Sequence, residues 1–521
     1  MNNIQESEAT QQISADELKG LNNFVKNIFK IKNPDEMIKT ANQAGLKKTL
    51  GAFDLIVLGV GAIIGSGIFT VIGLATVGDS STLGAGPGLV VSMILASLAC
   101  VFSALCYSEF ASMIPVAGSA YLYTYATMGE FFAWIIGWAV TLEYLVGYIA
   151  VSFAWTGYLM QFLKGFEKIL PAFITNPPAY LIGNEPIITL ANGNMPILLN
   201  VPAIIATIVI CMILIKGIQE STKMTAIMVA IKLLVIGLFI VAGAFYVKPE
   251  NWTPFAPNGI EGIISGAFII FFAYIGFDAI ATAAEETKNP QKNLPIGIIG
   301  SLAVCTVVYI LVELVLTGIM PLNAIDVKAP IAYAMNHVGQ NWFAGFISVG
   351  ALAGLTSVLL VLMLAGSRVL YAMSRDGFLP KSLQMVHKKF QTPYAITIGI
   401  AAVVIAGSFF IDINMAADLC VYGTFTSFII VCVAVLILRK TDPERHRPFK
   451  VPFSPLFPSL GVVCCGGLMG YYTFLKLTNV KENIMSTSPM LFLVWVLTGI
   501  MIYFTYSYKQ KRKLEAQDNN E

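Results

Sequence analysis

Long apolar runs separated by short polar segments dominate the chain. A helix needs about 20 apolar residues to cross about 30 Å of hydrocarbon, and the sequence contains twelve such runs. Their centres lie near Ile64, Cys100, Leu145, Ile208, Leu234, Ala273, Val308, Val358, Val403, Ile429, Val463 and Val496. The pattern predicts an all-α polytopic membrane protein with twelve transmembrane helices.

The ends of the chain are polar. Residues 1–50 mix both charges and lack the basic, apolar and small-residue order of a cleaved signal peptide, so we expect them to form a retained tail. Residues 51–508 form the predicted membrane body, and residues 509–521 form a second tail. Counted loop by loop, 25 of the 32 Lys and Arg residues fall on the side of the two tails and six on the other. Because basic residues accumulate in cytoplasmic loops, both termini are predicted to be cytoplasmic in a multi-pass cell-membrane protein.

Composition excludes several other classes of protein. Apolar residues make up 56% of the chain and charged residues 12%, against about a quarter charged in soluble proteins. The net charge is only +2, and no basic block with interleaved aromatic residues suggests a nucleic-acid partner. The eight cysteines lie in apolar stretches without metal-ligand spacing, and no HExxH or GxSxG motif is present. We therefore expect no metal, no cofactor and no enzymatic activity, and the sequence specifies no protein partner.

Two of the apolar runs carry sequences that are poorly suited to a continuous helix. In the first run, residues 61–69 contain three glycines and a serine, and in the sixth, residues 272–278 contain a glycine and an aspartate. Gly65 lies about 20 Å inside its span from one side, and Gly276 lies about 21 Å inside from the other. Paired breaks near the membrane midplane indicate the substrate site of a transporter built from inverted repeats.

The chemistry of such breaks follows from unpaired backbone groups. Exposed N–H groups favour an anion, and freed carbonyls favour an ammonium group. A zwitterionic amino acid matches both. We expect its α-carboxylate near Ser66 and Gly67, and its α-ammonium on the sixth helix.

A co-linear set of short motifs resembles the amino acid-polyamine-organocation superfamily, and in particular its bacterial cationic amino acid transporter branch. The motifs are GAFD (51–54), GSGIF (65–69), YSEFA (107–111), GSAY (118–121), FAYIGFD (272–278), EETKNP (285–290), PIGI (295–298) and SRDG (374–377). The resemblance implies a LeuT-type fold, in which two inverted five-helix repeats are followed by two further helices.

The resemblance also implies site residues. It places Ile63, Gly65, Ser66 and Gly67 at the substrate carboxylate, and Phe272, Ala273 and Ile275 at its ammonium. It further implies that a fifth-helix lysine, matching Lys232, stands where sodium-coupled relatives hold an ion. Lys232 lies about 15 Å into its span, too deep for easy snorkelling, so its charge must be paired or lost. We therefore expect Lys232 to couple transport to protons.

Two further ionisable residues are predicted inside the membrane. Glu143 lies in the long third span, and Asp278 follows the break in the sixth. Such residues are costly in lipid and are functional candidates, so we assign both to selectivity or gating. The structural alternative is that each only hydrogen-bonds a neighbouring helix.

Together these features predict a secondary active transporter that carries L-amino acids by alternating access. We expect it to be proton-coupled and sodium-independent, with the substrate held at unwound helices one and six. Two alternatives stay open: an exchanger of cationic amino acids or polyamines, and an amino acid sensor that has lost transport on the same fold. The sequence does not decide which amino acids are carried.

Overall fold

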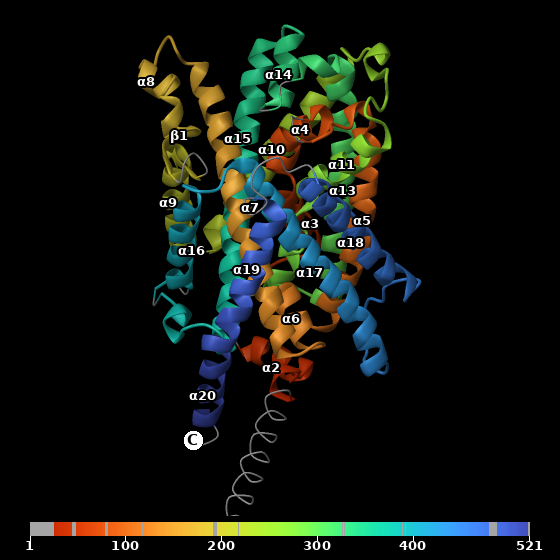
Figure 1. Ribbon diagram of the computed structural model, residues 1–521, viewed down its shortest axis with the longest axis vertical. Helices are drawn as coiled ribbons and strands as arrows, with labels where there is room; N and C mark the ends of the chain where they lie inside the picture. Colours follow the sequence, from red (N-terminus) through yellow and green to blue (C-terminus); the bar gives the residue numbers. More distant parts are fainter. Residues whose placement is uncertain are drawn as a thin grey trace, which may run out of the picture.

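A computed structural model shows a long helical bundle in which α2 (Pro34–Gln43) and α20 (Tyr508–Asp518), near the two termini of the chain, lie at the same end (Figure 1). The structure describes residues 26–43, 48–78, 82–116, 118–190, 195–216, 218–325, 327, 329–387, 389–390, 392–478 and 487–518. The end that carries α2 and α20 is called the tail end below, and the opposite end is called the outer end.

Each predicted apolar run corresponds either to one helix or to a span in which two shorter helices flank a break. In the first half of the chain these are α3 (Ala52–Ile63) with η1 (Gly67–Val71) and α4 (Ile72–Val77), α5 (Leu89–Met113), α7 (Glu130–Lys164), α9 (Val201–Lys216) and α10 (Ile218–Ala244). In the second half they are α11 (Gly259–Phe271) with η5 (Phe272–Tyr274) and α12 (Ala279–Thr282), α13 (Pro290–Ile319), α15 (Asn341–Arg375), α16 (Tyr394–Gly407), α17 (Ile413–Thr441), α18 (Leu456–Thr478) and α19 (Ser488–Ile502).

Shorter elements connect these helices or extend them. They are α2 (Pro34–Gln43), α6 (Ser119–Tyr125), α8 (Ala172–Thr175), α14 (Pro330–His337), α20 (Tyr508–Asp518) and the strands β1 (Ile182–Leu190) and β2 (Met195–Asn200). The two strands form an antiparallel hairpin between α7 and α9, which adds a small sheet to the predicted all-helical fold.

The helices confirm a polytopic α-helical membrane protein. In the described part of the chain, nine helices are long and apolar enough to cross a membrane, and the pair α3 and α4, bent by 42°, forms a tenth candidate. Helices α9 and α16 have only 16 and 14 residues, shorter than a typical span. The number of twelve spans therefore stays a prediction.

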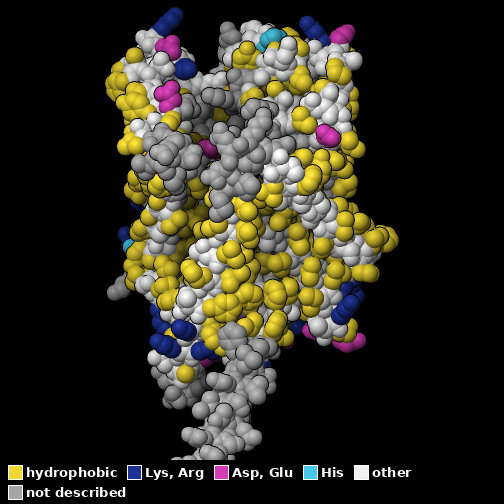
Figure 2. Space-filling view, in the orientation of Figure 1, with side chains coloured by type: hydrophobic (Ala, Val, Ile, Leu, Met, Phe, Trp, Pro, Cys, Tyr) yellow, Lys and Arg dark blue, Asp and Glu magenta, His cyan; other side chains and the backbone are white. Residues whose placement is uncertain are grey.

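The surface of the bundle is apolar around its middle. Large side chains such as Phe53, Trp342 and Val463 are 76%, 73% and 66% exposed, and a continuous apolar band covers the face seen in Figure 2. Such a band would be costly in water and suits a lipid bilayer. On this face, Lys and Arg side chains gather mainly below the band, at the tail end.

Corresponding helices in the two halves have similar lengths and contacts. The third and eighth, α7 and α15, both have 35 residues and pack against each other. The first helix, α3, packs on the seventh, α13, just as the sixth, α11, packs on the second, α5. The fifth, α10, packs on α15, just as the tenth, α17, packs on α7.

A buried ion cluster fixes the tail end of α5 to α17 and the segment after it. Glu109 is 1% exposed and accepts hydrogen bonds from Arg439 Nε at 3.0 Å and from the backbone N–H of Val451 at 2.7 Å. The Nε of Arg447 lies 3.4 Å from the same carboxylate. Two guanidinium groups, one buried (Arg447) and one partly buried (Arg439), therefore depend on one buried acid.

We predict that Glu109→Gln lowers the melting temperature of the detergent-solubilised protein by several degrees. The amide keeps the shape of the side chain but leaves the two arginines without a counter-charge, and breaking a buried ion pair costs about 3–5 kcal/mol. The control is Asp442→Asn, because Asp442 is 43% exposed and lies 3.5 Å from Arg445. Equal melting temperatures for the two variants would contradict this account of the cluster.

Candidate functional site

The first and sixth helices are both interrupted, and the two interruptions touch. Helix α3 ends at Ile63, Ile64 is extended with ψ 98°, and the helix resumes at Gly67. A Cβ atom added to Gly67 would lie 2.3 Å from the Cα of Ala273. Only glycine allows the two backbones to approach this closely.

The break in the sixth helix has a different geometry. Helix α11 continues into the short η5, after which Ile275 is extended with ψ 139°. Gly276 has φ +121°, a conformation that residues with a side chain rarely adopt. The chain becomes helical again at Ala279. Gly67 and Gly276 therefore determine where the first and sixth helices are interrupted.

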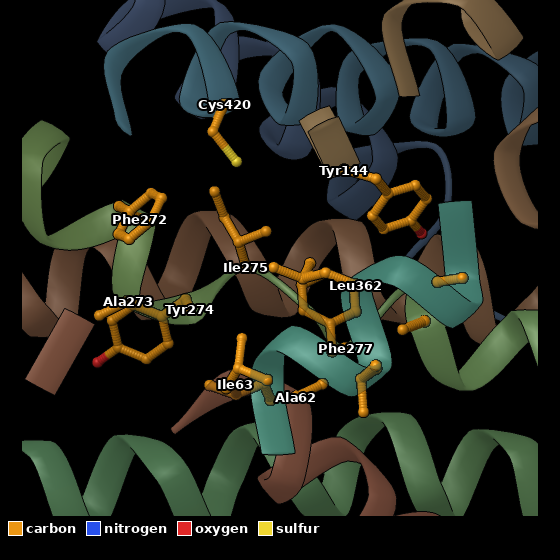
Figure 3. Packing of buried hydrophobic residues seen from close by; sticks show 14 of the residues in the cluster. Ala62, Ile63, Tyr144, Phe272, Ala273, Tyr274, Ile275, Phe277, Leu362 and Cys420 are labelled. Carbon is orange, nitrogen blue, oxygen red and sulfur yellow. The ribbon is translucent and has the colours of Figure 1, made fainter. Parts of the chain in front are cut away.

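A small cavity lies between the two breaks. Its volume is about 30 Å³, far below the about 300–1,000 Å³ of small-molecule sites, so its walls must move before an amino acid fits. The cavity is lined by Ala62, Ile63, Gly65, Ser66, Gly67, Gly147, Val151, Phe272, Ile275, Val358, Leu362 and Cys420. Figure 3 shows Cys420 pointing toward Ile275, with Ile63 and Ala62 beyond it.

Six of the seven predicted substrate residues line this cavity, and Ala273 does not. Ala273 is buried against Gly67 instead. Ser66 brings a polar side chain: its hydroxyl is buried and has no hydrogen-bond partner in the described part of the chain. The wall formed by α7, α15 and α17 is made of Gly147, Val151, Val358, Leu362 and Cys420, and no charged residue is among the described residues that line the cavity.

Tyr309 on α13 holds the two breaks together. Its hydroxyl oxygen lies 2.9 Å from the carbonyl of Ile63 and 2.8 Å from the carbonyl of Ala273. One hydroxyl hydrogen serves one acceptor at a time, so the bond alternates between two adjacent backbones. No sequence motif pointed to this residue, because its role depends on which side of α13 faces the breaks.

Lys232 contacts the first break from α10. Its Nζ donates to the carbonyls of Gly61 at 2.8 Å and Ile64 at 2.6 Å, and to the Ser357 hydroxyl on α15 at 3.2 Å. The side chain is fully buried, and no carboxylate in the described part of the chain forms an ion pair with it. Lys232 thus joins the fifth, first and eighth helices through neutral acceptors.

Glu143 and Asp278 lie close to the cavity but do not line it. Asp278 accepts a hydrogen bond from the Tyr144 hydroxyl at 2.7 Å, and Glu143 lies one turn before Gly147 on α7. Each acid keeps one buried oxygen without a partner among the described residues. A direct contact with the bound substrate would require a rearrangement of this region.

Contacts at the tail end tie the first and sixth helices together. The backbone N–H groups of Thr49 and Leu50 donate to the Glu286 carbonyl, and the N–H of Lys288 donates to the Leu50 carbonyl. The Glu286 carboxylate also pairs with Arg368 of α15 at 2.6 Å. These contacts link the half-helices below the cavity to α15.

We predict that Tyr309→Phe destabilises the protein by about 1–3 kcal/mol, because a buried carbonyl loses its donor. Thermal unfolding in detergent measures the effect, with Tyr394→Phe as the control. The Tyr394 hydroxyl lies 3.8 Å from the sulfur of Met385 at the surface, and phenylalanine keeps the ring that packs against His387. A Tyr309→Phe protein as stable as the control would show that the hydroxyl does not hold the breaks.

Comparisons with known proteins identify a matching family model and several similar sequences. Residues 50–501 match the family model described as amino acid permease. The branched-chain amino acid permease BcaP of Bacillus subtilis (strain 168) is 43% identical, over 93% of this chain and 98% of its own length. The methylthioribose transporter of the same organism is 41% identical, over 93% and 99%. The chloroplastic cationic amino acid transporter 9 of Arabidopsis thaliana is 37% identical, over 82% and 74%.

Proposed function

The chain belongs to the amino acid permease family, within the amino acid-polyamine-organocation superfamily, and we propose that it carries L-amino acids with small or branched apolar side chains. It is a multi-pass membrane transporter and not an enzyme. The observation that carries the proposal is the cavity between the two helix breaks. The wall that α7, α15 and α17 contribute to this cavity is apolar.

Recognition divides between the backbone and the side chains. The substrate α-carboxylate sits at the Ser66 hydroxyl and the N–H groups at the start of η1, where Gly67 begins a new helical segment. The α-ammonium sits at the carbonyls of the sixth-helix break around Phe272 and Ile275. The substrate side chain packs against Val151, Val358 and Leu362, which favours leucine, isoleucine and valine over arginine because a cation would find no acid there.

We predict that Gly67→Ala abolishes amino acid binding. The added methyl group would lie 2.3 Å from the backbone of Ala273 and would force the breaks apart. Binding is read from ligand-induced stabilisation in detergent, with leucine, isoleucine, valine, arginine and methylthioribose compared at equal concentrations. The control is Gly157→Ala on α7, where an added Cβ meets nothing within 4 Å.

Three results would decide the matter. Stabilisation of wild type and Gly157→Ala by leucine, with none in Gly67→Ala, supports the site. A Gly67→Ala protein that binds leucine as wild type does would place the site elsewhere. Stabilisation by methylthioribose or arginine, but not by leucine, would contradict the proposed substrate class.

The proposed architecture explains how the site opens to each side in turn. The matched lengths and contacts of the two halves support two inverted repeats, the first from α3 to α10 and the second from α11 to α17, followed by α18 and α19. Within the membrane body of residues 51–508, the broken helices move against the packed pair α7 and α15. The basic residues at the tail end support a cytoplasmic location for both termini.

The contacts of Lys232 support coupling to protons. An ammonium has three N–H donors, and Lys232 has three acceptors, two of them carbonyls at the first break. Loss of the proton removes a donor and the charge, which weakens the link between the break and α15. The proposed cycle therefore binds the substrate when the break is held by the protonated lysine and releases it after deprotonation, without sodium.

We predict that Lys232→Met binds leucine more weakly than wild type, because the break loses its link to α15, and that it fails to accumulate leucine when a pH gradient is imposed on proteoliposomes without sodium. Wild type should accumulate leucine, because inward proton flow drives the cycle. Accumulation by Lys232→Met equal to wild type would remove the lysine from coupling. Leucine exchange without gradient-driven accumulation in wild type would identify an exchanger, and binding without uptake or exchange would identify a sensor.

A further inference from the structure

A second, larger cavity lies near the outer end of the bundle. Its volume is about 320 Å³, within the range of small-molecule sites. The starts of α11, α17 and α19 and the end of α18 form most of its walls. We call it the outer cavity, and the side chains that matter here are Glu261, Asp412, Asp418, Tyr471, Tyr472 and Lys476.

The outer cavity has more acidic than basic side chains. Asp418 accepts hydrogen bonds from the Tyr472 hydroxyl at 3.0 Å and the Ser488 hydroxyl at 2.9 Å, and it lies 3.5 Å from Lys476 Nζ. This ion pair neutralises one acid. Glu261 and Asp412 then leave the described lining with a surplus of two negative charges, in contrast to the uncharged lining of the substrate cavity.

Aromatic side chains complete the walls. Tyr471 and Tyr472 both line the cavity, and Lys476 Nζ lies 5.2 Å from the centre of the Tyr472 ring. The Lys476 ammonium therefore already occupies the cation position at Tyr472. Tyr472 is also only 4% exposed and stacks on Phe268, so Tyr471 is the ring that remains for a ligand. Carboxylates beside the Tyr471 ring in a concave site are the chemistry that selects an organic cation over an anion or a neutral molecule.

We propose that the outer cavity is a second binding site, which takes a small organic cation with a primary ammonium group. The ammonium pairs with Glu261 and Asp412, and its carbon chain lies against the Tyr471 ring. The Oδ1 of Asp412 also accepts a hydrogen bond from the backbone N–H of Met415 at 2.8 Å. The volume accommodates a chain of several carbon atoms, whereas a bare metal ion would leave most of the space unfilled. A free amine and the ammonium headgroup of a lipid share this chemistry.

The outer cavity shares two helices with the substrate cavity. Asp418 lies two residues before Cys420 on α17, so one helix contributes to both cavities. Tyr472 stacks on Phe268 of α11 with ring centres 3.5 Å apart, and Phe268 lies one turn before Phe272 of the substrate cavity. A cation that braces α11 against α17 and α18 therefore slows opening of the substrate cavity without occupying it.

Thermal unfolding in a non-ionic detergent tests the site with 1,5-diaminopentane as the probe and 1,5-pentanediol as the uncharged control. We expect the diamine, but not the diol, to raise the melting temperature of wild type. In the double variant Glu261→Gln with Asp412→Asn, the apparent dissociation constant for the diamine should rise at least tenfold. Glu261→Gln alone changes only an exposed side chain and should raise it about threefold.

Glu250→Gln is the matched control, because Glu250 lies in the short helix η4 before α11 and does not line the outer cavity. Equal diamine stabilisation in the double variant and in Glu250→Gln would overturn the proposal, as would equal stabilisation by the diol. Phosphatidylethanolamine added to the micelles identifies the source: competition with the diamine indicates a lipid headgroup, and no competition indicates a free amine. This test measures diamine binding in the absence of leucine and of transport. A negative result here can therefore be distinguished from a negative result in the tests of the proposed function.

Discussion

The amine of Lys232 forms the contact on which the rest of the site depends. It sits in a membrane interior where a charge is costly, and it is held by two carbonyls that are available only because the first helix stops at Ile63. The break therefore supplies acceptors for the lysine, and the lysine stabilises the break. The third contact, to Ser357, extends this mutual support to α15, which packs on α3 and α12.

The same logic explains why the two breaks lie in contact. Unwound backbone in a membrane must find partners inside the protein. The carbonyls of Ile63 and Ala273 meet at the Tyr309 hydroxyl, and Gly67 lets the two chains approach without a side chain between them. What remains between the breaks is the Ser66 hydroxyl, which has no hydrogen-bond partner among the described residues, in an otherwise apolar cavity. That combination suits a molecule with one charged end that pairs with backbone and one apolar end that fills space.

Much of this arrangement could be predicted from the sequence. The depth of Gly65 and Gly276 follows from helix rise and places both breaks near the midplane, and a count of basic residues isolates Lys232 from every loop. The sequence could not show which side of a helix a residue faces once the helix is apolar all round. For that reason the sequence could not show that Tyr309 contacts both breaks, that Ala273 packs against Gly67, or that Glu143 and Asp278 lie beside the cavity without lining it. The hairpin of β1 and β2 joins two partly apolar runs that are separated in the sequence by Asn192-Gly193, a dipeptide typical of hairpin turns. These runs are too short and irregular to stand out beside the membrane spans.

Proton movement in wild-type protein tests the central claim most directly. Proteoliposomes containing a pH-sensitive dye are prepared in sodium-free buffer without a pH gradient, and a leucine gradient is then applied from outside. The account predicts acidification of the interior as leucine enters, which an ionophore for protons abolishes and which liposomes lacking the protein do not show. Entry of leucine with no change in internal pH would contradict the role of a protonated Lys232 in carrying the coupling ion.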